Sequence, residues 1–228
     1  MPIPTLSDYP LPEDGQLPSN AAGWQADPRR AALLIHDMQR YFLDFFPAGA
    51  TIVTHVVERL RVIRDRAHEL GIPVFYTAQP GAMTTAQRGL LRDIWGPGMS
   101  ADPAARQIVP ALAPQVFDTV LTKWRYSAFH STDLAESLSR LGRDQLIVGG
   151  VYGHVGVLTT LIEAFSRDIE TFLVADAFAD FSASDHWMTV RYAAKRCAVV
   201  LTADSLVAQL DSGLGPQLAH RHLSQLDA

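Results

Sequence analysis

The stretch QLIVGGVYGHVGVLTTLIEAF, residues 145–165, contains a strand, a turn and a helix in that order. Its first part, QLIVGG, is an apolar run of the kind found in strands buried on both faces of a parallel sheet. The apolar residues at helical spacing after the turn are Leu158, Leu161, Ile162 and Phe165. The turn between them has glycines, a tyrosine and a histidine, but no serine or cysteine. The stretch therefore predicts one strand–turn–helix unit of an α/β fold, with a turn that offers no nucleophile.

The same alternation continues on both sides of this stretch. The other strand-like runs are AALLIH (31–36), IPVFYTA (72–78), TVLTK (119–123), TFLVAD (171–176) and CAVVLT (197–202). The helical patterns between the runs cover 53–70, 84–94, 132–141, 158–165 and 184–196. Because parallel strands are joined by right-handed helical crossovers, this order predicts an α/β fold. We expect a three-layer α/β/α, Rossmann-like architecture with a six-stranded, mainly parallel sheet.

Length and composition indicate a single globular domain. The chain has 228 residues, of which 48% are hydrophobic and 19% charged, and this is enough for one sizeable core. Residues 1–30 are proline-rich and without periodicity, so we expect an extended N-terminal arm there. We expect the α/β domain to span 31–210, and residues 211–228 to form a frayed or partner-binding C-terminal tail.

The charge and cysteine content exclude several functions. A formal net charge of −5 and scattered basic residues argue against binding to nucleic acid or to a membrane surface. The single cysteine, Cys197, permits no intramolecular disulfide, and no secretory signal or apolar run long enough to span a bilayer is present. We therefore expect a cytoplasmic protein that acts on a small molecule.

Polar residues follow the first four predicted strands where each strand ends. They are Asp37, Gln79, Lys123 and Tyr152. Ligands of open α/β sheets bind outside the carboxyl ends of the strands. Each residue alone has a structural interpretation, such as a helix cap or a solvated charge, but four at one sheet edge predict a site.

Six motifs resemble those of the isochorismatase family, within the larger cysteine-hydrolase-like superfamily. They are LLIHDMQRYFL (33–43), YTAQPG (76–81), WGPGM (95–99), LTKWRYSAFH (121–130), GVYGHVGV (150–157) and VADAFADFS (174–182). The resemblance extends from about residue 5 to residue 205. The segment AQPGAMTTAQRGLLRDIWGPGM (78–99) is most similar to the phenazine-pathway branch, whose members hydrolyse 2-amino-2-deoxyisochorismate.

The resemblance implies a site without a covalent nucleophile. The amidases of the superfamily use an aspartate, a lysine and a cysteine, which correspond here to Asp37, Lys123 and Gly156. It also implies a cis peptide bond between Val151 and Tyr152. Covalent acyl transfer needs an activated nucleophile such as a thiolate, and we interpret Cys197, at the start of a strand, as a small core residue. Gly156 is expected to leave room where the amidases place sulfur.

The chemistry that remains is proton transfer to carbon. Isochorismate-type substrates carry an enolpyruvyl ether whose electron-rich methylene can accept a proton. Asp37 is the expected donor, so its pKa must be raised, which burial beside Phe42 and Trp95 would favour. Lys123 opposes this shift. We expect the conflict to be relieved when the substrate carboxylate pairs with Lys123.

The resemblance also implies a set of substrate-binding residues. They are Gln79, Arg88, Lys123, Tyr152 and the backbone of Gly156. We also expect Trp95 and Tyr126 to wall the substrate ring, and Phe42 to belong to the binding site beside Asp37. A guanidinium and an ammonium suit a substrate with two carboxylates. We interpret His36 and His154 as structural. No His/Asp cluster follows the second strand, so we expect neither a metal nor a cofactor.

Three alternatives remain open. Isochorismate itself, hydrolysed to 2,3-dihydro-2,3-dihydroxybenzoate and pyruvate in a siderophore pathway, would suit most of the same motifs. A cysteine-type amidase is disfavoured by Gly156, and a catalytically silent binding protein is disfavoured by intact Asp37, Lys123 and Arg88. We also expect a homodimer, with contacts from the N-terminal arm and the FFPAGA segment (45–50).

Overall fold

The computed structural model describes residues 3–213, which fold around one sheet. Its strands are β1 (Ala31–His36), β2 (Val74–Ala78), β3 (Thr119–Thr122), β4 (Gln145–Val151), β5 (Glu170–Ala179) and β6 (Val199–Leu201). Every neighbouring pair is parallel, and the order is β3-β2-β1-β4-β5-β6. This is the order of a doubly wound, Rossmann-like sheet. The expected fold class is confirmed, and the described sheet is wholly parallel.

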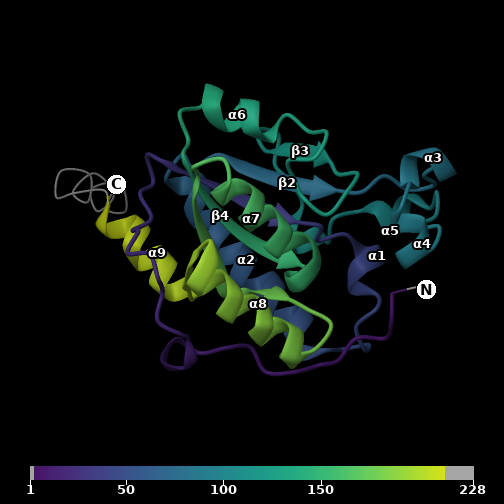
Figure 1. Cartoon of the computed structure of the whole chain (residues 1–228), viewed down its shortest axis with the longest axis horizontal. Coiled ribbons are helices and arrows are strands. Elements are labelled where there is room, and N and C mark those ends of the chain that lie inside the picture. Colours follow the sequence, from purple (N-terminus) through teal and green to yellow (C-terminus); the bar gives the residue numbers. More distant parts are fainter. Residues whose placement is uncertain (1–2, 214–228) are drawn as a thin grey trace, which may run out of the picture.

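Helices cover both faces of the sheet (Figure 1). The α-helices are α1 (Arg40–Leu43), α2 (Thr51–Glu69), α3 (Thr85–Arg88), α4 (Leu91–Trp95), α5 (Pro103–Arg106), α6 (Leu134–Arg140), α7 (Leu158–Phe165), α8 (Ala183–Arg196) and α9 (Ala203–Ser212). Short 3-10 helices occupy Asp14–Gln16 (η1) and Pro110–Leu112 (η2). Helices α2 and α9 pack on one face and α6, α7 and α8 on the other, giving the three layers expected.

Strand β1 contributes side chains to two hydrophobic cores, one on each face of the sheet. All six of its residues are buried. Leu33 and Ile35 belong to the core beneath α2, while Ala32 and Leu34 belong to the core beneath α7 and α8. Alternate side chains of a strand point to opposite faces of a sheet. A central parallel strand therefore needs apolar residues on both faces, which Ala31 to Ile35 supply before the strand ends at His36.

Some expected helix positions were wrong. Residues 84–94 form two short helices, α3 and α4, rather than one. Within 132–141, Leu141 was expected on an apolar helix pattern but ends α6 and is 47% exposed. Ile162 and Phe165 of α7 are also exposed, because Leu158, Leu161 and the small residues Thr160 and Ala164 fill its buried face. Helical spacing alone did not identify these small buried residues.

The turn after β4 is tighter than a simple loop. Residues Gly153–Val157 (η3) form a π-helical turn that leads directly into α7. The expected cis peptide bond between Val151 and Tyr152 is present. Gly150 has a φ of +122°, and a Cβ there would lie 2.1 Å from the carbonyl oxygen of His36 in β1. Glycine at this position lets β4 approach β1 at the end of the sheet.

The N-terminal residues lie along the body of the protein. The amide of Leu6 donates to the Phe45 carbonyl, and the Tyr9 hydroxyl accepts a hydrogen bond of 2.7 Å from the amide of Asp180. Apart from η1, residues 3–30 contain neither helix nor strand. Helix α9 continues to Ser212, two residues past the expected domain end, and the rest of the expected tail lies outside the described residues.

Candidate active site

The strand ends converge on one small cavity of about 50 Å³. All nine residues expected in the site line it: Asp37, Phe42, Gln79, Arg88, Trp95, Lys123, Tyr126, Tyr152 and Gly156. Strand β1 lies between β2 and β4, with β3 beyond β2, so the residues that follow these four strands share one edge. The parallel arrangement thus brings these side chains together, and their chemical roles are taken up below.

Asp37 and Lys123 form a buried ion pair at the centre of the cavity. Lys123 Nζ lies 2.9 Å from Asp37 Oδ2, and both residues are less than 5% exposed. Thr77 Oγ1 donates to Asp37 Oδ1 at 2.5 Å, and Gln79 Nε2 donates to Asp37 Oδ2 at 3.3 Å. Lys123 Nζ also donates to the Arg125 carbonyl at 2.8 Å. The carboxylate is therefore fixed by three side chains from β2 and β3.

Burial and the neighbouring charges act in opposite directions on the pKa of Asp37. Burial raises its pKa, but the positive charge of Lys123, the nearby His36 and the hydrogen bond from Thr77 outweigh burial, and the net shift is downward. Without substrate, Asp37 is therefore a carboxylate at neutral pH. This agrees with the expectation that Lys123 opposes burial in the free enzyme. A raised pKa of Asp37 in the substrate complex stays a prediction.

Arg88 supplies a second buried cation. Its guanidinium donates to Gln79 Oε1 at 3.3 Å and to the Gly96 carbonyl at 3.1 Å. It is 5% exposed, and no carboxylate among residues 3–213 forms an ion pair with it. A Cβ at Gly98 would lie 2.8 Å from its Cζ, so glycine there makes room for the guanidinium. Buried charges are normally paired, and an unpaired arginine favours an anionic ligand.

Aromatic rings form the walls of the cavity. Trp95 Nε1 donates to the Tyr126 hydroxyl at 2.8 Å, and the Tyr152 hydroxyl donates to the Phe42 carbonyl at 2.5 Å. Phe181 packs edge-on against Tyr152 with ring centroids 4.9 Å apart. These contacts satisfy the polar tips of the rings. The apolar parts of these rings line the same cavity as Asp37, Arg88 and Lys123.

The space beside Gly156 is filled rather than open. A Cβ at Gly156 would lie 2.3 Å from His36 Cε1 and 2.8 Å from His36 Nε2. The imidazole of His36 therefore occupies the position where a side chain at 156 would begin. The expected room for a sulfur atom is not present, because the ring one residue before Asp37 takes it.

His154 supports the turn rather than the cavity. Its Nδ1 lies 2.5 Å from Asp180 Oδ1, and its amide donates to Asp180 Oδ2 at 2.6 Å. Burial lowers the pKa of His154, but the hydrogen bond and charge of Asp180 outweigh it and raise the pKa overall. Asp180 itself is fully buried. The pair fixes η3, which carries Gly156.

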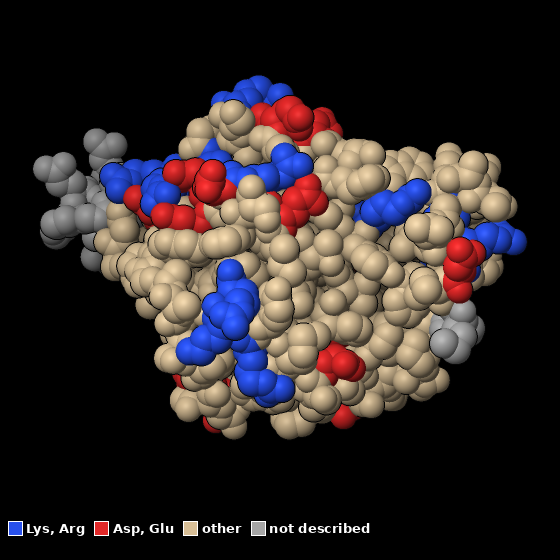
Figure 2. Space-filling view, viewed as in Figure 1, with Lys and Arg blue, Asp and Glu red and all other residues tan. Residues whose placement is uncertain are grey.

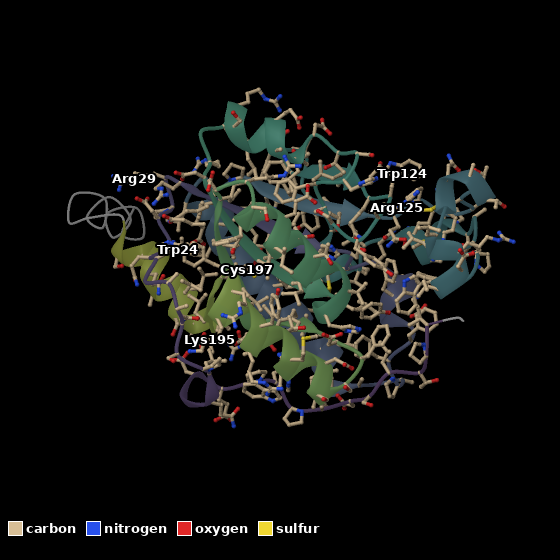
Figure 3. All side chains as sticks on the ribbon, viewed as in Figure 1. Trp24, Arg29, Trp124, Arg125, Lys195 and Cys197 are labelled. Atoms are coloured by element: carbon tan, nitrogen blue, oxygen red, sulfur yellow. The ribbon has the colours of Figure 1, made fainter. Side chains whose placement is uncertain are left out.

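Cys197 lies elsewhere in the molecule. It follows α8 at the amino end of β6, well apart from Arg125 in the loop after β3 (Figure 3). Burial raises the pKa of its thiol to about 11, which leaves it protonated and unreactive at neutral pH. Within residues 3–213, no group of three or more His, Cys, Asp or Glu side chains is placed to hold a metal ion.

Arg125 joins the strand ends to the segment that carries Arg88. Its Nη1 donates to the Gln87 carbonyl of α3 at 2.9 Å, while its own carbonyl accepts from Lys123. Figure 3 shows Trp124 and Arg125 on the side of the molecule where α3 and α4 lie. Arg125 therefore connects α3 to Lys123 through two hydrogen bonds.

Comparison with known proteins agrees with this geometry. The model of the isochorismatase domain matches residues 31–205. The chain belongs to the isochorismatase family. It is 56% identical over 205 residues to the phenazine biosynthesis protein PhzD of Pseudomonas fluorescens, an alignment that covers 90% of this chain and 98% of the relative. It is 50% identical to the isochorismatase of Bacillus subtilis (strain 168), over 93% of this chain and 68% of that protein.

The fold of this isochorismatase-family hydrolase also has solved counterparts. A cysteine hydrolase from Pseudomonas syringae pv. phaseolicola superposes with a TM-score of 0.77 at 24% identity, over 86% of this chain and 98% of the other. At that identity the likeness shows the fold alone. The family resemblance inferred from the six motifs is confirmed by the match of the isochorismatase domain over residues 31–205.

A larger hollow of about 1000 Å³ lies away from the ends of β1 to β4 that form the site. It separates the N-terminal arm from α2 and α9, and its walls include the acidic residues Asp14, Glu58 and Asp176. Asp176 lies 3.2 Å from Arg59. None of the groups of the proton-transfer site borders this hollow, so we assign the chemistry to the smaller cavity.

The surface gives two further facts about this hydrolase. On the face shown in Figure 2, acidic and basic side chains are interspersed along the upper edge, with a separate basic group below them. No continuous basic stripe of described residues crosses this face. None of the helices within residues 3–213 is long and apolar enough to cross a membrane.

Sequence reasoning missed several residues around the cavity. Thr77 contacts Asp37 directly, and Phe181 and Ile3 line the walls. Thr77 faces the site because it lies on β2 beside β1, a signal that strand pairing would have given. Phe181 lies within the motif VADAFADFS, which marked the position without its role. Ile3 comes from the arm, and no periodic pattern pointed to it.

Proposed function

We propose that this enzyme hydrolyses 2-amino-2-deoxyisochorismate to pyruvate and trans-2,3-dihydro-3-hydroxyanthranilate without a covalent intermediate. The observation that carries the proposal is a buried carboxyl group between two cations, in a cavity without a nucleophile. Asp37 lies 2.9 Å from Lys123, Arg88 lies beside Gln79, and Gly156 stands where the amidases have cysteine. The similarity to a phenazine biosynthesis protein over 90% of the chain supports the amino substrate.

The reaction begins with a proton transfer from Asp37 to the methylene carbon of the enolpyruvyl ether. The carbon–carbon double bond supplies the electron pair, and the ether carbon becomes an oxocarbenium ion. Water then adds to that carbon, and the hemiketal collapses to pyruvate and the ring alcohol. A positioned general acid contributes about 10²- to 10⁴-fold in rate.

The two cations prepare Asp37 for this step. A substrate carboxylate that pairs with Lys123 takes over part of its charge, which relieves the main factor that lowers the pKa of Asp37. Arg88 has no acidic partner in the described chain. Its guanidinium binds the other substrate carboxylate by donating two parallel hydrogen bonds. Substrate binding thus raises the pKa of Asp37, which takes up a proton from bulk solvent and becomes an acid, and Gln79 keeps the acid oriented.

Isochorismate is the second candidate substrate. The 50% identity to the Bacillus subtilis isochorismatase over 93% of the chain favours it. The same proton transfer would release pyruvate and 2,3-dihydro-2,3-dihydroxybenzoate. The two substrates differ only at ring position 2, where an amino group replaces a hydroxyl.

The test is product identification with both purified compounds. Pyruvate release is followed by coupling to lactate dehydrogenase, and the ring product is identified by mass. The proposal expects a higher kcat/KM for the amino compound. A higher value for isochorismate would replace the first substrate with the second, and pyruvate from neither would refute the function.

We also propose that the enzyme is a cytoplasmic homodimer that acts on this chorismate-derived small molecule. The support is the single buried thiol, together with the exposed apolar residues Val116, Phe117 and Val120 beside the edge strand β3. An exposed edge strand is available for pairing with a second copy. Sedimentation equilibrium should give twice the chain mass of 25.0 kDa, whereas the mass of one chain would contradict the dimer.

A further inference from the structure

His36 has a hydrogen-bond partner on one side of its ring only. Its Nδ1 lies 2.7 Å from the Val151 carbonyl oxygen. A carbonyl accepts hydrogen bonds and cannot donate them, so Nδ1 must carry the proton. In a neutral imidazole, Nε2 then carries a free lone pair. The sequence-based interpretation of His36 as structural accounts for Nδ1 but not for this second nitrogen.

The second nitrogen is buried at the site without a partner. Nε2 of His36 has no hydrogen bond to any described residue, although the residue is 1% exposed. The Tyr126 carbonyl is close enough to favour a charged ring but lacks hydrogen-bond geometry. The Cε1–Nε2 edge lies against Gly156, and both residues line the cavity. Buried polar atoms without partners are rare and often have a catalytic role.

We propose that His36 Nε2 orients the water that adds to the oxocarbenium carbon and takes its proton. This inference rests on the proposed vinyl-ether hydrolysis. The superfamily's amidases place their nucleophile at the position of Gly156, and here the lone pair of Nε2 borders that position. A water held by Nε2 therefore takes the place of a covalent nucleophile. In this proposal His36 is a catalytic residue and does not serve in packing alone.

The step balances without any external reagent. Asp37 gives its proton to the methylene carbon and becomes a carboxylate. A lone pair of water forms the new carbon–oxygen bond, and one water proton passes to Nε2. When the hemiketal collapses, the ring oxygen leaves with the proton from Nε2, and the hydroxyl proton returns to Asp37. Both side chains finish in their starting states.

The charges around the ring favour this order of events. Burial and the positive charge of Lys123 lower the pKa of His36, while Asp37, whose Oδ2 lies 3.9 Å from His36 Nδ1, raises it. Proton transfer to the substrate turns the bound acid Asp37 into an anion. The ring therefore gains basicity at the step in which water attacks, and stays neutral before it.

Two substitutions separate the two nitrogens. In His36→Asn the amide nitrogen can replace Nδ1 and keep the bond to Val151, but nothing replaces Nε2. In His36→Gln an oxygen or nitrogen reaches the position of Nε2. We expect kcat to fall about 100-fold or more in His36→Asn and to recover in part in His36→Gln. Near-normal turnover by His36→Asn, or no advantage of His36→Gln over it, would overturn the proposal.

Solvent deuterium shows which step is lost. In D₂O, His36→Asn should still protonate carbon, and return of a proton from the new methyl group to Asp37 should leave deuterium in the methylene of recovered substrate. The wild type should show little such label, because water traps the cation. Unlabelled substrate from a slow His36→Asn would mean that protonation itself was lost, which contradicts the role given to Nε2.

The tautomer is tested on the wild-type protein. With ¹⁵N-labelled histidine, NMR should show His36 as the neutral form protonated on Nδ1. A proton on Nε2 would overturn the proposal without any variant. Failure of the proposed function is distinguished from both results, because it appears as absence of pyruvate from wild-type enzyme with either substrate.

Discussion

The site is built from two regions that differ in how they are held. The strand ends carry Asp37 and Lys123, which are buried and fixed by neighbouring strands. The segment 82–99 carries Arg88 and Trp95 on two helices of only four and five residues. Leu90 and Ile94 in this segment are 80% and 54% exposed. The first region belongs to the sheet, and the second lies beyond the carboxyl end of β2, at one side of the molecule (Figure 1).

The difference indicates a division of labour. Rigid elements hold reacting groups accurately, whereas loops and short helices adapt to ligands. The cavity of about 50 Å³ is far below the ~300 Å³ or more of typical ligand pockets. Changes at the strand ends should then affect kcat, and changes in the segment should affect KM.

Asp37→Asn should have the largest effect. It removes the proton donor while nearly preserving its shape, so we expect kcat to fall by about 10⁴-fold, the upper range for a positioned acid. The matched control is Asp176→Asn, which changes a buried carboxyl group beside Arg59 outside the site. That variant should lose thermal stability but keep its rate. A near-normal kcat in folded Asp37→Asn would remove Asp37 from its role.

Gly156→Ala should have the next largest effect at the strand ends. The added methyl would meet the His36 ring at 2.3 Å, and displacing a catalytic group by about 1 Å can cost about 10²-fold in rate. Gly23→Ala is the control, because a Cβ there has no atom within 4 Å. Steady-state kinetics should show a lower kcat for the first variant alone, and an unchanged kcat would show that the ring position is unimportant.

Arg88→Lys should change KM more than kcat. Lysine keeps the charge but cannot form the bidentate fork, so we expect KM to rise about 10- to 30-fold, or about 1.4–2 kcal/mol of lost binding. Arg92→Lys, on exposed α4, should leave both parameters unchanged. Equal losses in kcat and kcat/KM for Arg88→Lys would place this residue with the strand-end groups instead.

The pH dependence should distinguish free from bound enzyme. The pKa of Asp37 is lowered in the free enzyme, so the acid form becomes scarcer as pH rises above that pKa. We expect kcat/KM to fall about tenfold per pH unit between about pH 6 and 8, while kcat, which reports the bound complex, stays level to higher pH. A level kcat/KM over that range would mean that the free enzyme already holds a protonated Asp37.

The sequence predicted the first region better than the second. Apolar runs determine a parallel sheet, and a parallel sheet brings Asp37, Gln79 and Lys123 to one edge whatever the loops do. The segment 84–94 has no such constraint, and its division into α3 and α4 depends on tertiary contacts such as Arg125 with Gln87. The opposing effect of Lys123 on the pKa of Asp37 could be predicted from the sequence, but the net direction in the free enzyme depends on how close the two groups lie.

The role of His36 was hidden for a different reason. A histidine in an apolar strand is compatible with a purely structural bond, and the bond to Val151 is indeed present. Only the three-dimensional structure shows that the His36 ring fills the space beside Gly156 and that its Nε2 has no hydrogen-bond partner among the described residues. Residue type and spacing cannot reveal a buried polar atom that lacks a hydrogen bond.

The central claim is that Asp37 protonates the methylene carbon and water then attacks the adjacent ether carbon. Its most direct test is one turnover experiment with wild-type enzyme in deuterated, ¹⁸O-enriched water, with pyruvate trapped at once as lactate. The account predicts one solvent deuterium in the methyl group and a ring alcohol that keeps its original oxygen. A methyl group without deuterium, or ¹⁸O in the ring alcohol, would contradict it.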